Sequence, residues 1–186
     1  MVARTMGKAK LKQTRFRLRR GLKRQIGWGV ALLVAITVGY FAYQAVGELP
    51  GTSVPILGTY HIQNLATPRL PYNSDPPTSG PHLGSIASWG VHTEPIPKEL
   101  QVHNLEDGGV LVQYNCPQGC PDLLDKLTSI VNSYEQHVIL APYPGMDRRI
   151  ALTAWGRIDK FDEFDEQRMT RFIKAYKGID HHVQRF

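Results

Sequence analysis

The chain has 186 residues, of which 42% are hydrophobic, and its formal net charge is +6. This composition supports a folded core and excludes the disordered and collagen-like classes. The charge is unevenly distributed, because residues 1–24 hold ten Lys and Arg and no acid, whereas the remaining 162 residues hold 12 basic and 16 acidic side chains. A nucleic-acid-binding protein carries its positive surface on the folded domain, so we expect no nucleic acid among the partners of this chain.

A basic leader over residues 1–25 precedes an uncharged stretch of 21 residues, 26–46. As a helix, the stretch would span about 30 Å, the thickness of the hydrocarbon core of a bilayer. Trp28 lies near one end and Tyr40 and Tyr43 near the other, as interfacial anchors do. We therefore expect one transmembrane helix in the lipid bilayer of the cytoplasmic membrane, with a cytoplasmic N-terminus and a periplasmic or extracellular C-terminal part. A cleaved signal peptide is the alternative interpretation, because such peptides also begin basic and turn apolar.

The exported part is expected to begin with an irregular segment. Residues 47–71 are rich in Pro, Gly, Ser, Thr and Asn, which predicts a linker that becomes an ordered lead-in, with a short extended piece near Pro55–Tyr60. We expect a folded extracytoplasmic domain over residues 72–180 and a tail over residues 181–186.

Periodicity predicts the strands and helices of this domain. Strands are expected where β-branched, aromatic and other apolar residues cluster, at Gly109–Tyr114, His137–Leu140 and Arg149–Trp155. Helices are expected where apolar residues recur at helical spacing, one beginning at Pro121 and one over residues 162–177. The order strand, helix, strand, strand, helix predicts an α+β fold, or a small α/β fold, in which two helices pack on a short mixed sheet.

Two cysteines, Cys116 and Cys120, lie between a predicted strand and the helix that begins at Pro121. Their spacing permits a local disulfide, which an oxidising compartment would favour. The amides at a helix N-terminus would equally stabilise a reactive thiolate. The sequence Cys-x-x-x-Cys-Pro also resembles the copper site of the SCO-type chaperones of cytochrome oxidase assembly, in which a distant histidine completes the thiolate pair. A structural disulfide, a ligand pair and a redox pair all remain open.

Histidines supply further candidate ligands, and all seven follow the uncharged stretch. His82, His92 and His103 fall within 22 loop-like residues, and Met146 adds a thioether in another loop. Imidazole, thiolate and thioether together suit Cu(I), whereas imidazoles with a carboxylate suit zinc. A single histidine in a loop is more often hydrogen-bonded than metal-bound, so only the grouping of these residues favours a metal site.

Other polar residues point to no catalytic group. Glu106 and Asp107 could ligate zinc, but in an extended segment adjacent carboxylates point to opposite faces. The terminal pair His181 and His182 is interpreted as a solvated end. Neither HExxH nor GxSxG occurs, and no glycine-rich phosphate loop precedes a helix, so we predict no catalytic residue.

Three separated segments resemble one known family: Tyr72–His82 reads YNSDPPTSGPH, Val102–Cys116 reads VHNLEDGGVLVQYNC, and Ala151–Arg157 reads ALTAWGR. Their order is similar to that in the bacterial family catalogued as domain of unknown function 3105, over roughly residues 55–180. Members of that family typically carry one N-terminal membrane anchor, which agrees with the expectation for residues 26–46.

The resemblance has one departure. Relatives commonly read HNLEHGG, with a second histidine where this chain has Asp107. If the family's site uses both imidazoles, the carboxylate here would lower the affinity for a soft ion or shift its binding to the cysteines, which many relatives lack. His82, His103 and Met146 match the family position by position.

The preferred hypothesis is a single-pass membrane protein whose exported domain binds a transition metal, with copper as the expected cofactor, to hold or deliver it without catalysis. The predicted ligands are His82, His103, Met146, Cys116 and Cys120. One alternative is an accessory subunit of a larger membrane complex that has no chemistry of its own and docks through Trp89, Tyr143 and Trp155. The other is a thiol–disulfide or SCO-like redox protein that uses Cys116 and Cys120.

Overall fold

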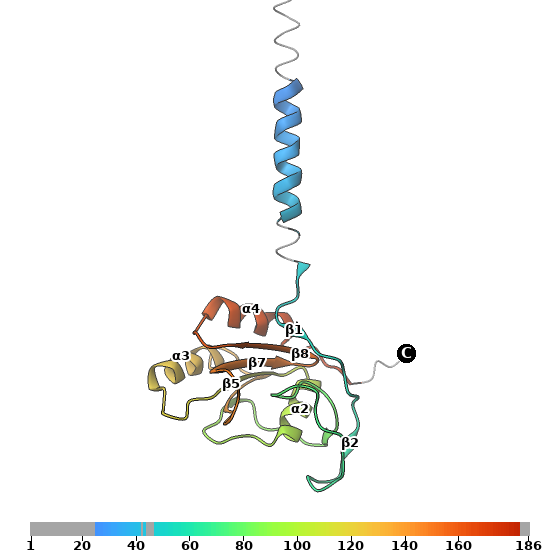
Figure 1. Ribbon diagram of the computed structural model, residues 1–186, viewed down its shortest axis with the longest axis vertical. Helices are drawn as coiled ribbons and strands as arrows, with labels where there is room; N and C mark the ends of the chain where they lie inside the picture. The colour runs from blue at the N-terminus through green and yellow to red at the C-terminus, as the bar shows by residue number, and fades with distance from the viewer. Residues whose placement is uncertain (1–24, 42, 44–46, 183–186) are drawn as a thin grey trace, which may run out of the picture. The chain divides into compact units, whose positions relative to one another are not determined.

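The computed structural model of the protein describes residues 25–41, 43 and 47–182. The chain divides into two compact units, residues 1–49 and residues 50–186. In the first unit, residues 25–41 are helical, as Figure 1 shows. None of the helices that the structure describes is both long and apolar enough to cross a membrane. The predicted leader and residues 42 and 44–46 of the predicted transmembrane stretch lie outside the described residues.

The second unit is built on a mixed sheet with the strand order β1-β8-β7-β5-β6-β4. The strands are β1 Thr52–Ser53, β4 Gly90–Val91, β5 Val110–Tyr114, β6 Val138–Pro142, β7 Ile150–Ala154 and β8 Arg157–Phe161. The central strands β5 and β6 are parallel, whereas β7 is antiparallel to both β5 and β8. Two further strands, β2 His61–Ile62 and β3 His82–Leu83, form a separate parallel pair. The α+β class and the mixed sheet are therefore confirmed.

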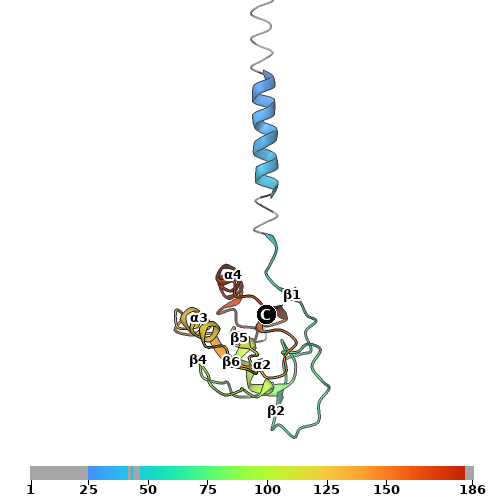
Figure 2. The same cartoon turned by 60° about the vertical axis from the view of Figure 1, so that its left-hand side comes forward.

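Helices cover both faces of the sheet (Figure 1). They are α2 Lys98–Glu106, α3 Pro121–Val131 and α4 Glu166–Tyr176. Alternate strand residues such as Val110, Val112 and Leu152 pack with α3 and α4. The intervening Leu111 and Ile139 pack with Leu105 of α2 on the opposite face. In the turned view, β5 and β6 lie between α3 and α2 (Figure 2).

The helix α2 departs from the prediction, which treated this segment as a loop. Few of its buried positions are apolar, because Gln101, His103, Asn104 and Glu106 are all buried. Gln101 is satisfied inside the fold: its Nε2 donates to Ile96 O at 2.6 Å, and its Oε1 accepts from Gln113 Nε2 at 2.7 Å. A helix that buries polar side chains shows little apolar periodicity, so the pattern that predicts α3 and α4 is absent here.

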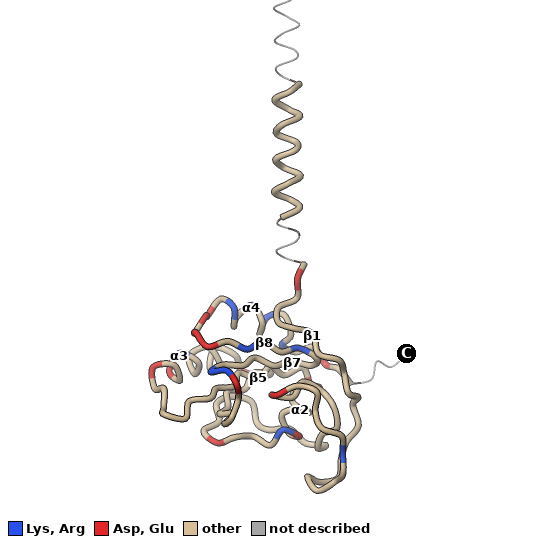
Figure 3. Tube along the Cα trace, viewed as in Figure 1, with Lys and Arg blue, Asp and Glu red and all other residues tan. Residues whose placement is uncertain are grey.

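Basic and acidic residues are interspersed along the trace of the second unit (Figure 3). Several form ion pairs, including Arg168 with Asp159 at 2.6 Å and Lys160 with Asp147 at 2.7 Å.

Candidate metal centre

The small parallel sheet places two histidines side by side. His61 of β2 is in register with His82 of β3, and their ring centroids lie 4.9 Å apart. The buried side chain of Ile62 holds β2 against the domain, and His82 N donates to Tyr60 O at 3.3 Å. The loop before β3, residues 76–81, is buried, which makes His82 fully buried while His61 stays exposed.

Helix α2 adds a third imidazole and a carboxylate. His103 and Glu106 are three residues apart on α2 and therefore share one helix face. The ring of His103 stacks on His61 at 5.0 Å with an interplanar angle of 10°, and it lies 5.0 Å from the ring of His82. Glu106 is 1% exposed. Two strands and a helix thus converge on one small volume.

The residues after α4 complete the cluster. His182 Nε2 lies 3.5 Å from Glu106 Oε2, and its ring centroid lies 5.8 Å from that of His103. The backbone N–H of the preceding residue, His181, donates to Glu106 O at 2.8 Å. His182 is exposed, as expected of a solvated end, but its ring also faces the buried carboxylate, which the sequence does not predict.

Each of three histidines uses its Nδ1 to donate a hydrogen bond to an oxygen atom. The acceptors are Gly80 O for His82 at 2.7 Å, Leu83 O for His103 at 2.5 Å and Asp180 Oδ1 for His182 at 2.8 Å. A proton on Nδ1 leaves the lone pair of a neutral imidazole on Nε2. Metal-ligating histidines are oriented in this way, by a hydrogen bond from the ring nitrogen that does not bind the ion.

The contact between His82 and Glu106 is the most informative one in the cluster. His82 Nε2 and Glu106 Oε2 lie 2.8 Å apart, with side chains 0% and 1% exposed. Neither atom has a hydrogen-bond partner of acceptable geometry among the described residues. Burial lowers the pKa of His82 and favours the neutral ring, although the Gly80 carbonyl and Glu106 oppose this effect. A nitrogen lone pair and a carboxylate oxygen repel each other at this distance unless a proton or a metal ion lies between them.

The spacing of the donor atoms suits a single ion. His61, His103, Glu106 and His182 each offer one ligand atom, and these atoms all lie within 4.8 Å of one another. Metal–nitrogen and metal–oxygen bonds of about 2.0–2.1 Å place two ligand atoms roughly 2.9 Å apart at a right angle and roughly 3.4 Å apart in a tetrahedron. Within this group, the 3.5 Å separation between Glu106 Oε2 and His182 Nε2 is close to the tetrahedral value. His82 Nε2, outside the group, lies 2.8 Å from the same carboxylate oxygen.

The predicted site residues are only partly brought together. His82 and His103 are neighbours in the cluster, as described above. Met146 packs instead with Tyr143 and Ala151, and its carbonyl accepts from Asn115 Nδ2 at 2.7 Å. His82 itself is not one of the four described residues, His61, His103, Glu106 and His182, whose ligand atoms lie within 4.8 Å of one another, but it contacts Glu106 directly.

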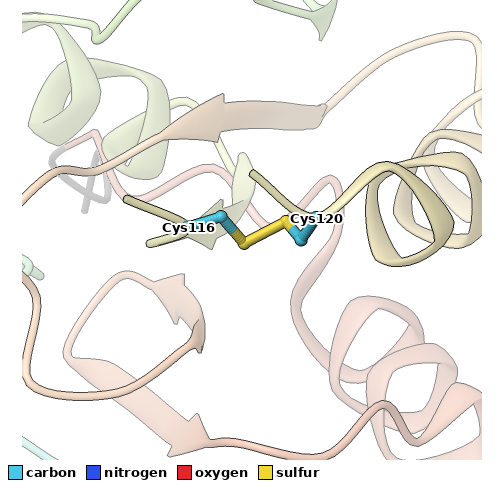
Figure 4. Close-up of a disulfide and its surroundings, with 2 residues drawn as sticks. All are labelled: Cys116 and Cys120. Carbon is cyan, nitrogen blue, oxygen red and sulfur yellow. A yellow bond between two sulfur atoms is a disulfide. The ribbon is translucent and has the colours of Figure 1, made fainter. Parts of the chain in front are cut away.

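The cysteines form a disulfide rather than a pair of thiolates (Figure 4). Cys116 and Cys120 have Cα atoms 5.9 Å apart and pack against the core on the α3 and α4 face of the sheet. His103 lies on α2, which packs on the opposite face. The sulfur atoms are thus separated from the imidazoles by the sheet itself, and this corrects the prediction of one mixed sulfur and nitrogen site.

Two of these ligand candidates, His61 and His182, were not predicted from the sequence, and Glu106 was considered only as a possible zinc ligand in an extended segment. The role of Glu106 could have been predicted from the sequence if residues 98–106 had been recognised as a helix, because Glu106 then lies on the same helix face as His103. No local sequence pattern indicates His61 or His182, since each reaches the cluster through tertiary contacts with residues far away in the chain.

A family model described as "Protein of unknown function (DUF3105)" matches residues 63–184, more than half of the chain. The chain belongs to this family. The DUF3105 match contains His82, His103, Glu106 and His182, and it begins two residues after His61. Neither the comparison with curated proteins nor the comparison with solved structures returned a match.

The position where the resemblance to DUF3105 leads us to expect a histidine lies at the edge of the cluster. Asp107 Oδ1 is 3.6 Å from His103 Nε2 and 3.4 Å from His182 Nδ1. The side chain at this position therefore belongs to the immediate surroundings of the candidate ligands.

Proposed function

We propose that this protein is a single-pass, membrane-anchored extracytoplasmic protein that binds one transition-metal ion in order to hold or deliver it. The observation that carries the proposal is the 2.8 Å contact between His82 Nε2 and Glu106 Oε2, two buried atoms that lack hydrogen-bond partners among the described residues. A bound cation would turn this repulsive contact into two favourable ones. The exposed His61 and His182 at the rim give an ion a route in and out.

The donor atoms favour copper in its divalent form, or zinc. Imidazole and carboxylate ligands suit Cu(II) and Zn(II), and divalent copper binds such sites more tightly than the other first-row ions. Cu(I) prefers thiolate and thioether ligands, and the sulfur atoms of Met146, Cys116 and Cys120 lie outside the cluster. We therefore propose Cu(II) as the primary ligand and Zn(II) as its closest competitor.

The proposed location rests on the sequence. The cations of residues 1–24 and the uncharged stretch 26–46 support a membrane anchor with a cytoplasmic N-terminus. The Cys116–Cys120 disulfide is typical of an oxidising compartment. Extraction of membranes with alkaline carbonate tests this location: the full chain should stay in the pellet, and its appearance in the supernatant would contradict the anchor.

Metal binding is tested on the purified full-length chain without a histidine tag. We expect one Cu(II) per chain in competition with a chromophoric chelator. Glu106→Gln keeps the size of the side chain and removes the charge, so it should abolish tight binding. His92→Ala is the matched control, because His92 bonds to Ser88 outside the cluster and its loss should change nothing. Absence of Cu(II) and Zn(II) binding by the unaltered protein would overturn the proposal.

A thiol–disulfide function is the second candidate. The disulfide lies immediately before α3, and residues 117–119 between its half-buried cysteines are exposed. A measured reduction potential far below that of the compartment would make the bridge purely structural. The third hypothesis, docking through three aromatic residues, finds less support, because Tyr143 is buried and Trp89 and Trp155 pack against the α2 face of the sheet.

A further inference from the structure

The residues that follow α4, Gly178–His182, form a tail segment that folds back onto the C-terminal end of α2. Gly178 N donates to Gly108 O at 2.7 Å, and His181 N donates to Glu106 O at 2.8 Å. The tail approaches so closely that a Cβ added to Gly108 would lie 2.6 Å from Ile179 N. The tail segment is thus held by its backbone at the same residue whose carboxylate faces the donor atoms.

Side chains of the tail segment extend this attachment to the site. The ring of His181 stacks on Trp155 with centroids 5.9 Å apart and an interplanar angle of 21°. His182 directs Nε2 toward Glu106, and its Nδ1 donates to Asp180, so the aspartate that orients the ring belongs to the same segment. The tail segment therefore carries a complete ligand unit: the imidazole, its orienting acceptor and its backbone anchor.

The donors differ sharply in how easily they can leave. His82 and Glu106 are 0% and 1% exposed, so neither can move away from an ion without opening the core. The side chain of His182 is 44% exposed and lies on a segment beyond the last helix. Removing this imidazole requires only the loss of the tail's own contacts, which leaves the sheet and α2 intact.

We propose that the tail segment is the exchangeable arm of the metal centre: the ion is released when Gly178–His182 detaches and a donor of the accepting molecule takes the place of His182. The inference rests on the proposed function and specifies how delivery proceeds. The accepting group is an imidazole or another neutral nitrogen donor, because it must replace a nitrogen ligand beside the Glu106 carboxylate. A bound ion in turn fastens the tail to α2.

The rate of metal release tests the proposal. Full-length protein loaded with Cu(II) is mixed with excess chelator, and release is followed by stopped flow. His182→Ala should still bind one ion through the remaining donors but release it at least about tenfold faster, since even loss of an outer-shell partner of a ligand costs roughly 10- to 100-fold in affinity. His92→Ala should release at the unaltered rate. If the unaltered protein binds no metal, the proposed function fails. If the unaltered protein binds the ion and His182→Ala releases it at the same rate as the unaltered protein, the proposed function stands and only the proposal of an exchangeable arm is wrong.

Tail attachment supplies a second measurement that does not depend on a release rate. Trypsin cleaves after Lys177, an exposed residue directly before the tail segment. Bound Cu(II) should slow the appearance of the peptide that begins at Gly178, as followed by mass spectrometry, in the unaltered protein but not in His182→Ala. Equal protection of both proteins, or protection of neither, would overturn the proposal.

Discussion

His82 Nε2 lies 2.8 Å from Glu106 Oε2 although no hydrogen bond joins the two atoms. The Nδ1 atom of His82 is already committed to Gly80 O at 2.7 Å. When the ring is neutral, as its burial favours, Nε2 presents a lone pair to the buried carboxylate. Buried polar atoms in folded proteins nearly always have partners, and exceptions are informative about ligands. The predictions below follow from placing a cation at this contact.

Glu106→Gln should separate metal binding from stability. Without metal, the glutamine side-chain amide can donate an N–H from Nε2 to the lone pair of the neutral imidazole, so the variant should be at least as stable as the unaltered protein. Added Cu(II) at 100 times the dissociation constant should stabilise the unaltered protein by about 2.7 kcal/mol and leave Glu106→Gln unchanged. Thermal unfolding with and without metal measures both effects. An equal stabilisation of the two proteins would exclude Glu106 as a ligand.

Asp107→His should raise the affinity for copper relative to zinc. The aspartate lies 3.6 Å from His103 Nε2 and 3.4 Å from His182 Nδ1, so an imidazole there can join or support the donor set. We expect a gain on the order of tenfold, the scale on which neighbours of metal ligands act. Competition titrations with the two ions measure the ratio of the copper and zinc affinities. If this ratio is the same in the variant and in the unaltered protein, the side chain at position 107 does not affect the metal site.

Gly108→Ala should accelerate metal release by displacing the tail segment. Gly108 has φ +77, and an added Cβ would lie 2.6 Å from Ile179 N. A left-handed conformation alone costs a residue with a side chain about 1–3 kcal/mol. Gly145→Ala is the matched control, because Gly145 has φ +82 but no heavy atom within 4 Å of an added Cβ. If both variants release the metal at the same rate, the faster release is caused by backbone strain and not by displacement of the tail segment.

Removing the disulfide should leave metal binding intact. Cys116 and Cys120 pack on the α3 and α4 face of the sheet, so replacing both by Ser changes no donor atom of the cluster. The short loop that they close predicts a loss of stability of about 2 kcal/mol. Chemical unfolding measures the loss, and competition titration measures the affinity. If the folded variant no longer binds copper, the cysteine sulfur atoms must take part in binding the ion.

Asp75→Asn should make stability less dependent on pH in acid. Burial would raise the pKa of Asp75, but hydrogen bonds from Lys98 and Tyr143 outweigh it and hold the pKa below its usual value. A lowered pKa contributes stability above the unfolded value of about 3.9, and this contribution is lost as the pH falls through the folded value. The variant should therefore be less stable at pH 7 and approach the unaltered protein near pH 2. If the difference in unfolding free energy between the two proteins stays constant with pH, the contribution of Asp75 to stability does not depend on its charge.

Local pattern was sufficient for the part of the fold in which burial and apolar character coincide. The strands β5, β6 and β7 and the helices α3 and α4 follow from runs such as Val110–Tyr114 and from the apolar stripe that ends at Tyr176. Strand β8 was missed because Arg157–Phe161 is only half-buried and largely polar. Helix α2 was missed for the converse reason, since its buried face is polar and its partners, such as Gln113, lie on the sheet.

The candidate site could be predicted only in part, because its donors come from four separate segments. His82 and His103 were recognised from their sequence surroundings, but nothing local indicates that His61 pairs with His82 in register. The placement of His182 depends on Gly108, because a Cβ at this position would lie only 2.6 Å from Ile179 N of the tail segment. The sulfur ligands Met146, Cys116 and Cys120 were a reasonable expectation from composition. The cysteines follow β5, however, and pack on the face of the sheet that α3 and α4 cover, away from the histidines.

X-ray absorption spectroscopy of the full-length protein loaded with one equivalent of Cu(II) tests the central claim most directly. An ion bound by the histidines and Glu106 should show a first shell of nitrogen and oxygen atoms at about 2.0 Å, with the outer-shell signature of several imidazoles. A sulfur atom at about 2.3 Å would assign the ion to the cysteines or Met146. Copper surrounded by water oxygens alone, without imidazole, would contradict the metal centre altogether.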